Sequence, residues 1–186
     1  MTLFSEQPYK RVMVFIDFRN IYNSCLNFAG TEKLRMDLFR LTQILVGSRD
    51  LVGAYVFDAS MKGSMDLETK KMHDKLSDIG FRVVNRESIV KRDNGYEQKE
   101  VDVSLACEML EHALLNHFDI AIVVSGDRDF VPVMQKVQAA GKRVEVAAFE
   151  NVYSDECKRT ADVYYTLNDI PFLSMSSPIS LGGEQE

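Results

Sequence analysis

Two carboxylates follow directly on an apolar run in the second half of this 186-residue chain. Asp127 and Asp129 stand in the segment 125–130, Ser-Gly-Asp-Arg-Asp-Phe, immediately after the apolar residues 120–124. Such a run predicts a strand buried on both faces, and the helical pattern from residue 130 onward predicts the next element. Both acids are therefore expected at the carboxyl end of a central strand, where ligands bind in open parallel sheets. Paired acids at that place indicate a site for a divalent cation.

Asp17 and Asp102 are expected to approach the same edge of the sheet. Asp17 directly follows the apolar residues 12–16, so it either caps the next helix or joins the site. Asp102 opens a helical pattern whose inward-facing positions, such as Leu105 and Met109, are apolar. A carboxylate on such a stripe is costly to desolvate unless it has a partner, although simple capping remains an alternative. Because crowded carboxylates repel one another, Mg²⁺ or Mn²⁺ would relieve the repulsion by binding their oxygens.

The elements that must position these acids alternate between strand and helix almost from end to end. Strand patterns cover residues 12–16, 52–57, 81–85, 120–124 and 143–149, and helical patterns cover 20–28, 37–46, 65–78, 101–115 and 130–140. This alternation predicts an α/β fold with a mainly parallel sheet and right-handed crossovers. The polar stretch 88–99 contains Asp-Asn-Gly, which predicts either a small hairpin or a mobile loop.

Length and composition are those of one globular domain. Hydrophobic residues make up 46% of the chain and charged residues 27%, with a formal net charge of −6. We expect an N-terminal extension over residues 1–10, a single domain over 11–172 and a disordered tail over 173–186, where Ser, Pro, Gly and Glu accumulate. The three cysteines are far apart and expected to be reduced, and they share no zinc-ligand spacing with the histidines. Without a signal peptide or an apolar run of membrane-spanning length, a cytoplasmic protein with no membrane contact is expected.

Three motifs together resemble the NYN domain family and, within it, the LabA-like proteins, relatives of the PIN nucleases. They are Phe15-Ile16-Asp17 with Asn20, the segment 99–103 (Lys-Glu-Val-Asp-Val), and the segment 125–130. The resemblance extends over about residues 11–149. It implies a PIN-like, Rossmann-like three-layer sandwich, whose parallel sheet of about five strands, in the order 3-2-1-4-5, is flanked by helices. It also implies a metal-dependent, ribonuclease-type centre that uses Mg²⁺ or Mn²⁺.

The resemblance assigns roles to individual residues. It implies Asp17, Asp102 and Asp127 as metal ligands and catalytic acids, with Asp129 completing the catalytic set. Asn20 and Ser125 would orient ligands or substrate. One departure is that Phe18 and Arg19 stand where the family often has small or flexible residues. Arg19 and Arg128 are assigned to substrate binding, with pairing to an acid or simple solvation as the alternatives.

The implied reaction is hydrolysis of RNA phosphodiester bonds by a metal-activated water. Lys91, Arg92 and Lys99 form the best local basic cluster for an RNA backbone, with Tyr96 available for stacking on a base. An ordinary solvated loop is the alternative for this cluster. The acidic net charge lacks the basic face typical of nucleic-acid binders, so weak RNA contact, a protein partner or a homodimer is expected to accompany the site.

Three other functions compete with this one. The first is an NYN module that binds RNA or regulates, with little turnover. The second is a haloacid-dehalogenase-type phosphatase, which is disfavoured because Arg19 stands where its second aspartate would be. The third is a Toprim-like site, which is weaker because no preceding strand pattern ends in Glu.

Overall fold

The computed structural model describes residues 10–29, 34–61, 67–92, 95–97, 99–150 and 154–175. Their main feature is a seven-stranded sheet in the order β5-β4-β3-β1-β6-β7-β8. All neighbouring strands are parallel except β5, which pairs with β4 in the antiparallel sense. The strands are β1 (Arg11–Asp17), β3 (Asp50–Met61), β4 (Arg82–Arg92), β5 (Gly95–Glu97), β6 (Ile120–Val124), β7 (Arg143–Ala148) and β8 (Val163–Thr166).

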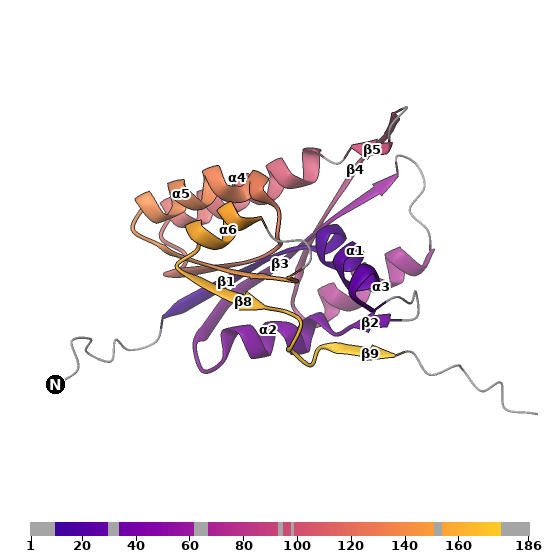
Figure 1. Ribbon diagram of the computed structural model, residues 1–186, viewed down its shortest axis with the longest axis horizontal. Helices are drawn as coiled ribbons and strands as arrows, with labels where there is room; N and C mark the ends of the chain where they lie inside the picture. Colours follow the sequence, from indigo (N-terminus) through magenta and orange to yellow (C-terminus); the bar gives the residue numbers. More distant parts are fainter. Residues whose placement is uncertain are drawn as a thin grey trace, which may run out of the picture.

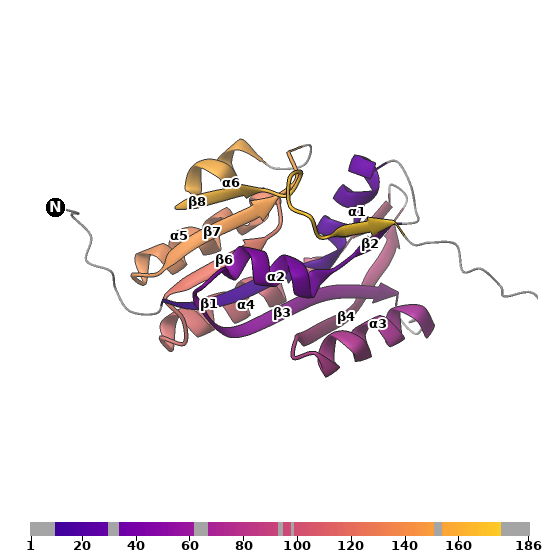
Figure 2. The same cartoon turned by 90° about the horizontal axis from the view of Figure 1, so that it is seen from below.

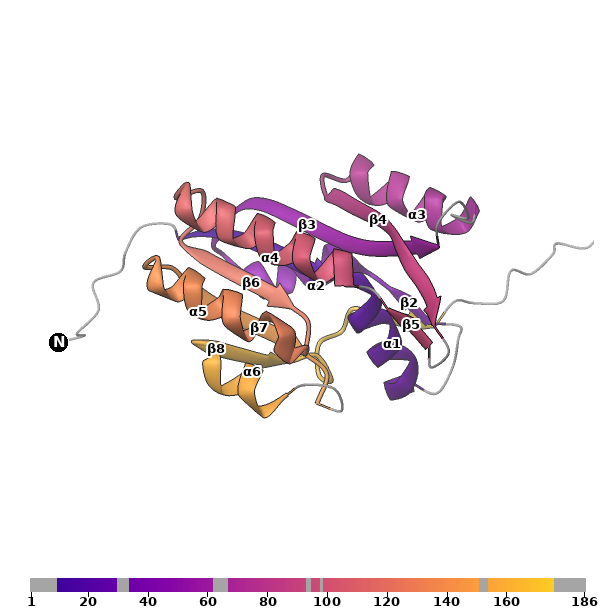
Figure 3. The ribbon, with the colours of Figure 1, turned by 90° about the horizontal axis from the view of Figure 1, so that it is seen from above.

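Helices cover both faces of this sheet and complete a three-layer sandwich (Figure 1). One face carries α1 (Phe18–Ala29), α2 (Leu38–Val46) and α3 (Leu67–Asp78), as Figure 2 shows from below. The other face carries α4 (Lys99–Leu114), α5 (Val131–Ala139) and α6 (Asp155–Thr160), which lie in front of the sheet in Figure 3.

Two apolar clusters, one on each face, hold the layers together. Alternate residues of a central strand enter different clusters: Val14 packs with α1 and α2, whereas Phe15 packs with α4. This two-sided burial explains why the central strands are continuous apolar runs rather than alternating ones. On α4 the buried positions recur every four residues, at Val101, Leu105, Met109 and Ala113, which fits helical periodicity.

The predicted order of the five strand patterns is confirmed, because they correspond to β4-β3-β1-β6-β7 in the observed sheet. The expected number of parallel strands is corrected from about five to six by β8. This strand escaped prediction because it has only four residues, all half-buried, and therefore shows neither a buried run nor an alternation. The polar stretch before α4 forms the hairpin of β4 and β5, while residues 93–94 lie outside the described part.

A second, two-stranded sheet joins β2 (Leu34–Met36) to β9 (Leu173–Met175) in the antiparallel sense. The expected disordered tail began at residue 173, so its first three residues are instead a strand. The reason is packing, since Leu173 lies against the apolar cluster beneath α1 and α2. The Asp37 N–H also donates to the Phe172 carbonyl at 2.9 Å. Residues 1–9 and 176–186 lie outside the described part, and the outer domain limits stay predictions.

Candidate active site

The adjacent strands β1 and β6 end side by side at the carboxyl edge of the sheet. Ile16 is the register partner of Val124, so Asp17 and Ser125 follow at equivalent positions. The Ser125 hydroxyl donates to Asp17 Oδ2 at 3.1 Å. This is the point at which the strand order reverses, the usual ligand position in doubly wound sheets.

Asp17 is nearly enclosed, with 6% of its surface exposed, and its two carboxylate oxygens have different partners. Oδ1 accepts the backbone N–H of Asn20 at 3.2 Å, which caps the first turn of α1. Oδ2 accepts the Ser125 hydroxyl from the neighbouring strand. Asp17 therefore caps α1. It also lies at the switch point of the sheet, and its role in a site there stays a prediction.

Hydrogen bonds fold the segment after β6 against the start of α1. The Gly126 N–H donates to the side-chain Oδ1 of Asn20 at 3.2 Å, and the Asp127 N–H donates to the Ser125 hydroxyl oxygen at 3.2 Å. Asp127 Oδ1 in turn accepts the Asp129 N–H at 2.9 Å and caps the 3₁₀ turn η1 (Arg128–Phe130). Asp127 is half-buried and Asp129 is exposed, so Asp127 lies closer to the interior.

The acids from these separate elements act on one another electrostatically. Burial raises the pKa of Asp17 to about 7, against the lowering effect of the Asn20 and Ser125 hydrogen bonds, and the charges of Asp102 and Asp127 raise it further. Burial also raises the pKa of Asp102 to about 6, with added contributions from Asp127 and Asp129. The neutral forms of Asp17 and Asp102 are therefore favoured, and ionising these acids brings negative charges close to one another.

The donor set suits a hard divalent cation, because carboxylate and hydroxyl oxygens are the ligands such ions prefer. Within the described ranges, no group of three or more His, Cys, Asp or Glu side chains stands ready to hold a metal ion. An ion bound at this edge would therefore complete its coordination with water, as Mg²⁺ commonly does.

The remaining predicted site residues have more varied surroundings. Arg19 donates from Nε to Asp58 Oδ1 at 2.7 Å and from Nη2 to the Ala59 carbonyl at 2.8 Å. Its guanidinium is thus engaged by β3, and its assignment to substrate binding stays an untested prediction. Arg128 is exposed on η1. Lys91 and Arg92 belong to β4 and Lys99 begins α4, but the side chains of this basic cluster and of Tyr96 lie outside the described part.

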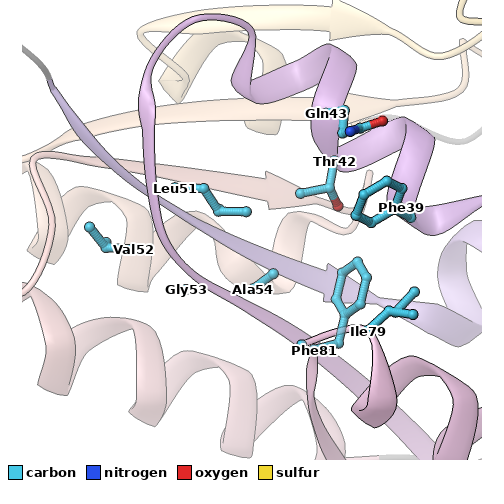
Figure 4. Close-up of a pocket in the computed structure, with 10 residues that line it drawn as sticks. Phe39, Thr42, Gln43, Leu51, Val52, Gly53, Ala54, Ile79 and Phe81 are labelled. Carbon is cyan, nitrogen blue, oxygen red and sulfur yellow. The ribbon is translucent and has the colours of Figure 1, made fainter.

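Asp58 and His73 are notable residues that the sequence reasoning missed. Asp58 is fully buried, and besides Arg19 it contacts His73 Nε2 through Oδ2 at 2.8 Å. The signal was available, because Asp58 directly follows the predicted strand 52–57 just as Asp17 and Asp127 stand behind theirs. A cavity with mainly apolar walls lies elsewhere, between α2 and the amino end of β3 (Figure 4), and none of these acids lines it.

The doubly wound sheet with acids at its switch point defines a PIN-like α/β protein. The NYN domain family model matches residues 11–168, and the chain therefore belongs to the NYN family. Membership of the LabA-like branch stays a prediction.

Two known proteins resemble the chain. The uncharacterized protein MJ0482 of Methanocaldococcus jannaschii is 25% identical over 118 residues, which is 55% of this chain and 48% of that protein. The chain therefore matches only about half of that relative's length. The crystal structure of VPA0982 from Vibrio parahaemolyticus, titled a protein of unknown function, superposes with a TM-score of 0.74 at 23% identity. It covers 92% of this chain and all of the other, which supports the fold.

Membrane contact was not expected from the sequence. Of the helices in the described ranges, none combines the length and apolar character that crossing a bilayer requires.

Proposed function

We propose that the acids at the carboxyl edge hold a divalent cation and that the protein hydrolyses RNA phosphodiester bonds there. The observation that carries this proposal is the charge imbalance at the strand ends. The pKa of Asp17 is raised to about 7 and that of Asp102 to about 6 by burial and neighbouring acids. Such buried acids do not stabilise a hydrophobic core, whereas their carboxylates would stabilise a cation bound at this place.

Asp17, Asp102 and Asp127 are the residues that would hold Mg²⁺ or Mn²⁺, with Asp129 supporting them from the exposed side. The bound cation would supply an activated water and stabilise negative charge on the phosphate. Ser125 and Asn20 orient the acids: the hydroxyl fixes Asp17, and the amide oxygen holds the backbone of Gly126. Arg128, which is exposed between Asp127 and Asp129, would bind an RNA phosphate.

The acids themselves repel an RNA backbone, so RNA is expected to bind this edge only together with the cation. Cation binding requires Asp17 and Asp102 to be ionised, and it therefore releases protons near neutral pH. This linkage makes RNA affinity rise with pH between about 6 and 8 at a fixed Mn²⁺ concentration.

A second candidate function is an NYN module that binds RNA with little turnover. The observation that favours it is that the described acids do not form a ready-made ligand set. Either function includes RNA binding by the basic cluster Lys91, Arg92 and Lys99. Either also includes a homodimer, which would add RNA affinity, and a cytoplasmic location, which would give access to RNA.

Cleavage of single-stranded and structured RNA with Mn²⁺ or Mg²⁺ distinguishes these functions. We expect cleavage by the wild type and a loss of at least ~100-fold in Asp127→Asn and Asp102→Asn. Asp74→Asn, an exposed aspartate of α3, is the matched control and should keep full activity. Cleavage that persists in Asp127→Asn would come from a contaminant and overturn the proposal. Metal-dependent RNA binding without cleavage would favour the regulatory module.

A further inference from the structure

A buried charged cluster lies one strand away from the acidic site, on the opposite face of the sheet. Phe57 of β3 is the register partner of Asp17, and Asp58 follows it. Asp58 shares the strand face of Ala54 and Val56, which pack with α1, α2 and α3, whereas Asp17 shares the face of Met13 and Phe15, which pack with α4. The two aspartates are therefore neighbours that point away from each other.

Asp58 is held rigidly by its surroundings. It has no exposed surface and accepts Arg19 Nε at 2.7 Å and the Ala59 N–H at 2.8 Å on Oδ1. His73 Nε2 of α3 lies 2.8 Å from Oδ2. Arg19 also donates to the Ala59 carbonyl at 2.8 Å, so its planar guanidinium binds two neighbouring residues of β3.

We infer that Asp58 is a positioning residue for the acidic site and acts through Arg19 and Asn20. Arg19 lies in the first turn of α1, directly before Asn20. Asn20 makes two of the contacts that organise the site: its N–H donates to Asp17 Oδ1, and its side-chain Oδ1 accepts the Gly126 N–H. A displaced first turn would therefore shift Asp17 and the segment that carries Asp127 together.

The energetics of the cluster support a positioning role over a simply stabilising one. The Asp58 side chain is fully buried and that of Arg19 is 30% exposed. Removing a buried carboxylate from water costs free energy that its attraction to arginine only partly returns, so replacing both residues by an apolar pair is often neutral or stabilising. A guanidinium bound to a carboxylate instead fixes the orientation of both side chains, because their hydrogen bonds form only at defined angles. The effect of Asp58 on metal binding rests on the proposed function. The contacts between Asp58, Arg19 and Asn20 do not depend on a cation.

The test compares two buried carboxylates that are both paired with arginine. Glu145 of β7 is 2% exposed and pairs with Arg49 at 2.8 Å and with Arg143 at 3.4 Å, but it lies at the amino edge of the sheet, away from Asn20. Asp58→Asn and Glu145→Gln therefore remove a comparable charge with and without a connection to the site. Amide hydrogen exchange of Gly126, followed by NMR on the full chain without metal, is the direct readout.

We expect the Gly126 amide to exchange at least ~10-fold faster in Asp58→Asn than in the wild type, and to be unchanged in Glu145→Gln. Arg19→Lys, which keeps the charge but not the fork, should give an intermediate rate. If Asp58→Asn does not fold, the same comparison is made with Arg19→Lys and Arg49→Lys. Unchanged Gly126 exchange in the Asp58 and Arg19 variants, or an equal change in the control variants, would overturn the inference.

Mn²⁺ affinity, measured by electron paramagnetic resonance without RNA, gives the functional consequence. Asp58→Asn should weaken Mn²⁺ binding about 10-fold, the usual effect of losing a group that orients metal ligands, and Glu145→Gln should leave it unchanged. Equal Mn²⁺ affinity in both variants would overturn the inference. If the wild type itself binds no Mn²⁺, the proposed function fails, and the Gly126 measurement alone decides whether Asp58 positions the site.

Discussion

Asp17 and Asp58 stand on neighbouring strands at almost the same height, yet their surroundings are opposite. Asp58 is matched by a guanidinium, an imidazole and a backbone N–H. Among the described residues, a hydroxyl and a backbone N–H donate to Asp17, and other acids raise its pKa beyond the effect of burial. The same residue type at the same kind of position is thus compensated on one face and uncompensated on the other. The proposed cation would bind on the uncompensated face.

The largest expected effect concerns pH and Asp17. A folded-state pKa of about 7, against an ordinary 3.8, means that the folded protein holds this proton more tightly than the unfolded chain. The free energy of unfolding therefore falls as pH rises from about 4 to 7 and stays lowered above pH 7, by about 4 kcal/mol in all. In urea titrations without metal, Asp17→Asn should remove the contribution of Asp17 and leave the smaller one of Asp102, whose pKa is raised to about 6. If the free energy of unfolding changed with pH in the same way in the wild type and in the variant, the contrast between Asp17 and Asp58 would be contradicted.

Removing the compensated acid should have the opposite sign. Asp58→Ala leaves the Arg19 charge without its partner and is expected to lower the free energy of unfolding by about 3 kcal/mol at pH 8. Asp17→Ala at the same pH should not lower it, because the penalty of ionising Asp17 disappears with the carboxylate. Urea unfolding of both variants provides the measurement, and equal losses would show that the two acids are equivalent.

A cation should supply the compensation that Asp17 lacks. At pH 8, Mn²⁺ at about 100 times its dissociation constant should raise the free energy of unfolding by about 2.7 kcal/mol. The gain should shrink at pH 6, where Asp17 is protonated, and in Asp102→Asn, which lacks one of the acids. Thermal unfolding with and without Mn²⁺ tests this expectation. A gain that is independent of pH and of Asp102 would place the ion elsewhere.

The smallest expected effect concerns the geometry of the compensated face. Arg19→Lys keeps the positive charge beside Asp58 but loses the second contact, to the Ala59 carbonyl, and should cost about 1 kcal/mol. Chemical denaturation of this variant, with Arg40→Lys on the exposed side of α2 as its control, measures the difference. A loss as large as that of Asp58→Ala would mean that the fork, rather than the charge, dominates.

Much of the fold could be predicted from local patterns. The apolar runs of β1 and β6 signal strands buried on both faces, and the acids directly behind them signal the carboxyl edge. The order of five strands followed from the family resemblance and is confirmed. Strands β8 and β9 could not be predicted this way. Each is short, and each forms a strand because it pairs with a neighbouring one.

The candidate site divides in the same way. The sequence indicates Asp17, Asp102, Asp127 and Asp129 as candidates because each follows a strand or begins a helix in a recognisable pattern, and their role stays a prediction. The partner of Arg19 was not found, because Asp58 lies 39 residues away and its pairing depends on which face of β3 meets α1. A phosphate, an acid of the site and solvent were all compatible with Arg19 in the sequence.

Burial periodicity and chain direction are local properties, so the amino-acid sequence predicts the central strands, most helices and the acids that end these elements. Which of these acids meets a cationic partner depends on how the layers pack. Charges separated by dozens of residues meet only after the layers have packed, and their pKa values depend on that packing. The division between the compensated Asp58 and the uncompensated Asp17 is therefore a property of the folded sheet, with one aspartate on each of its faces.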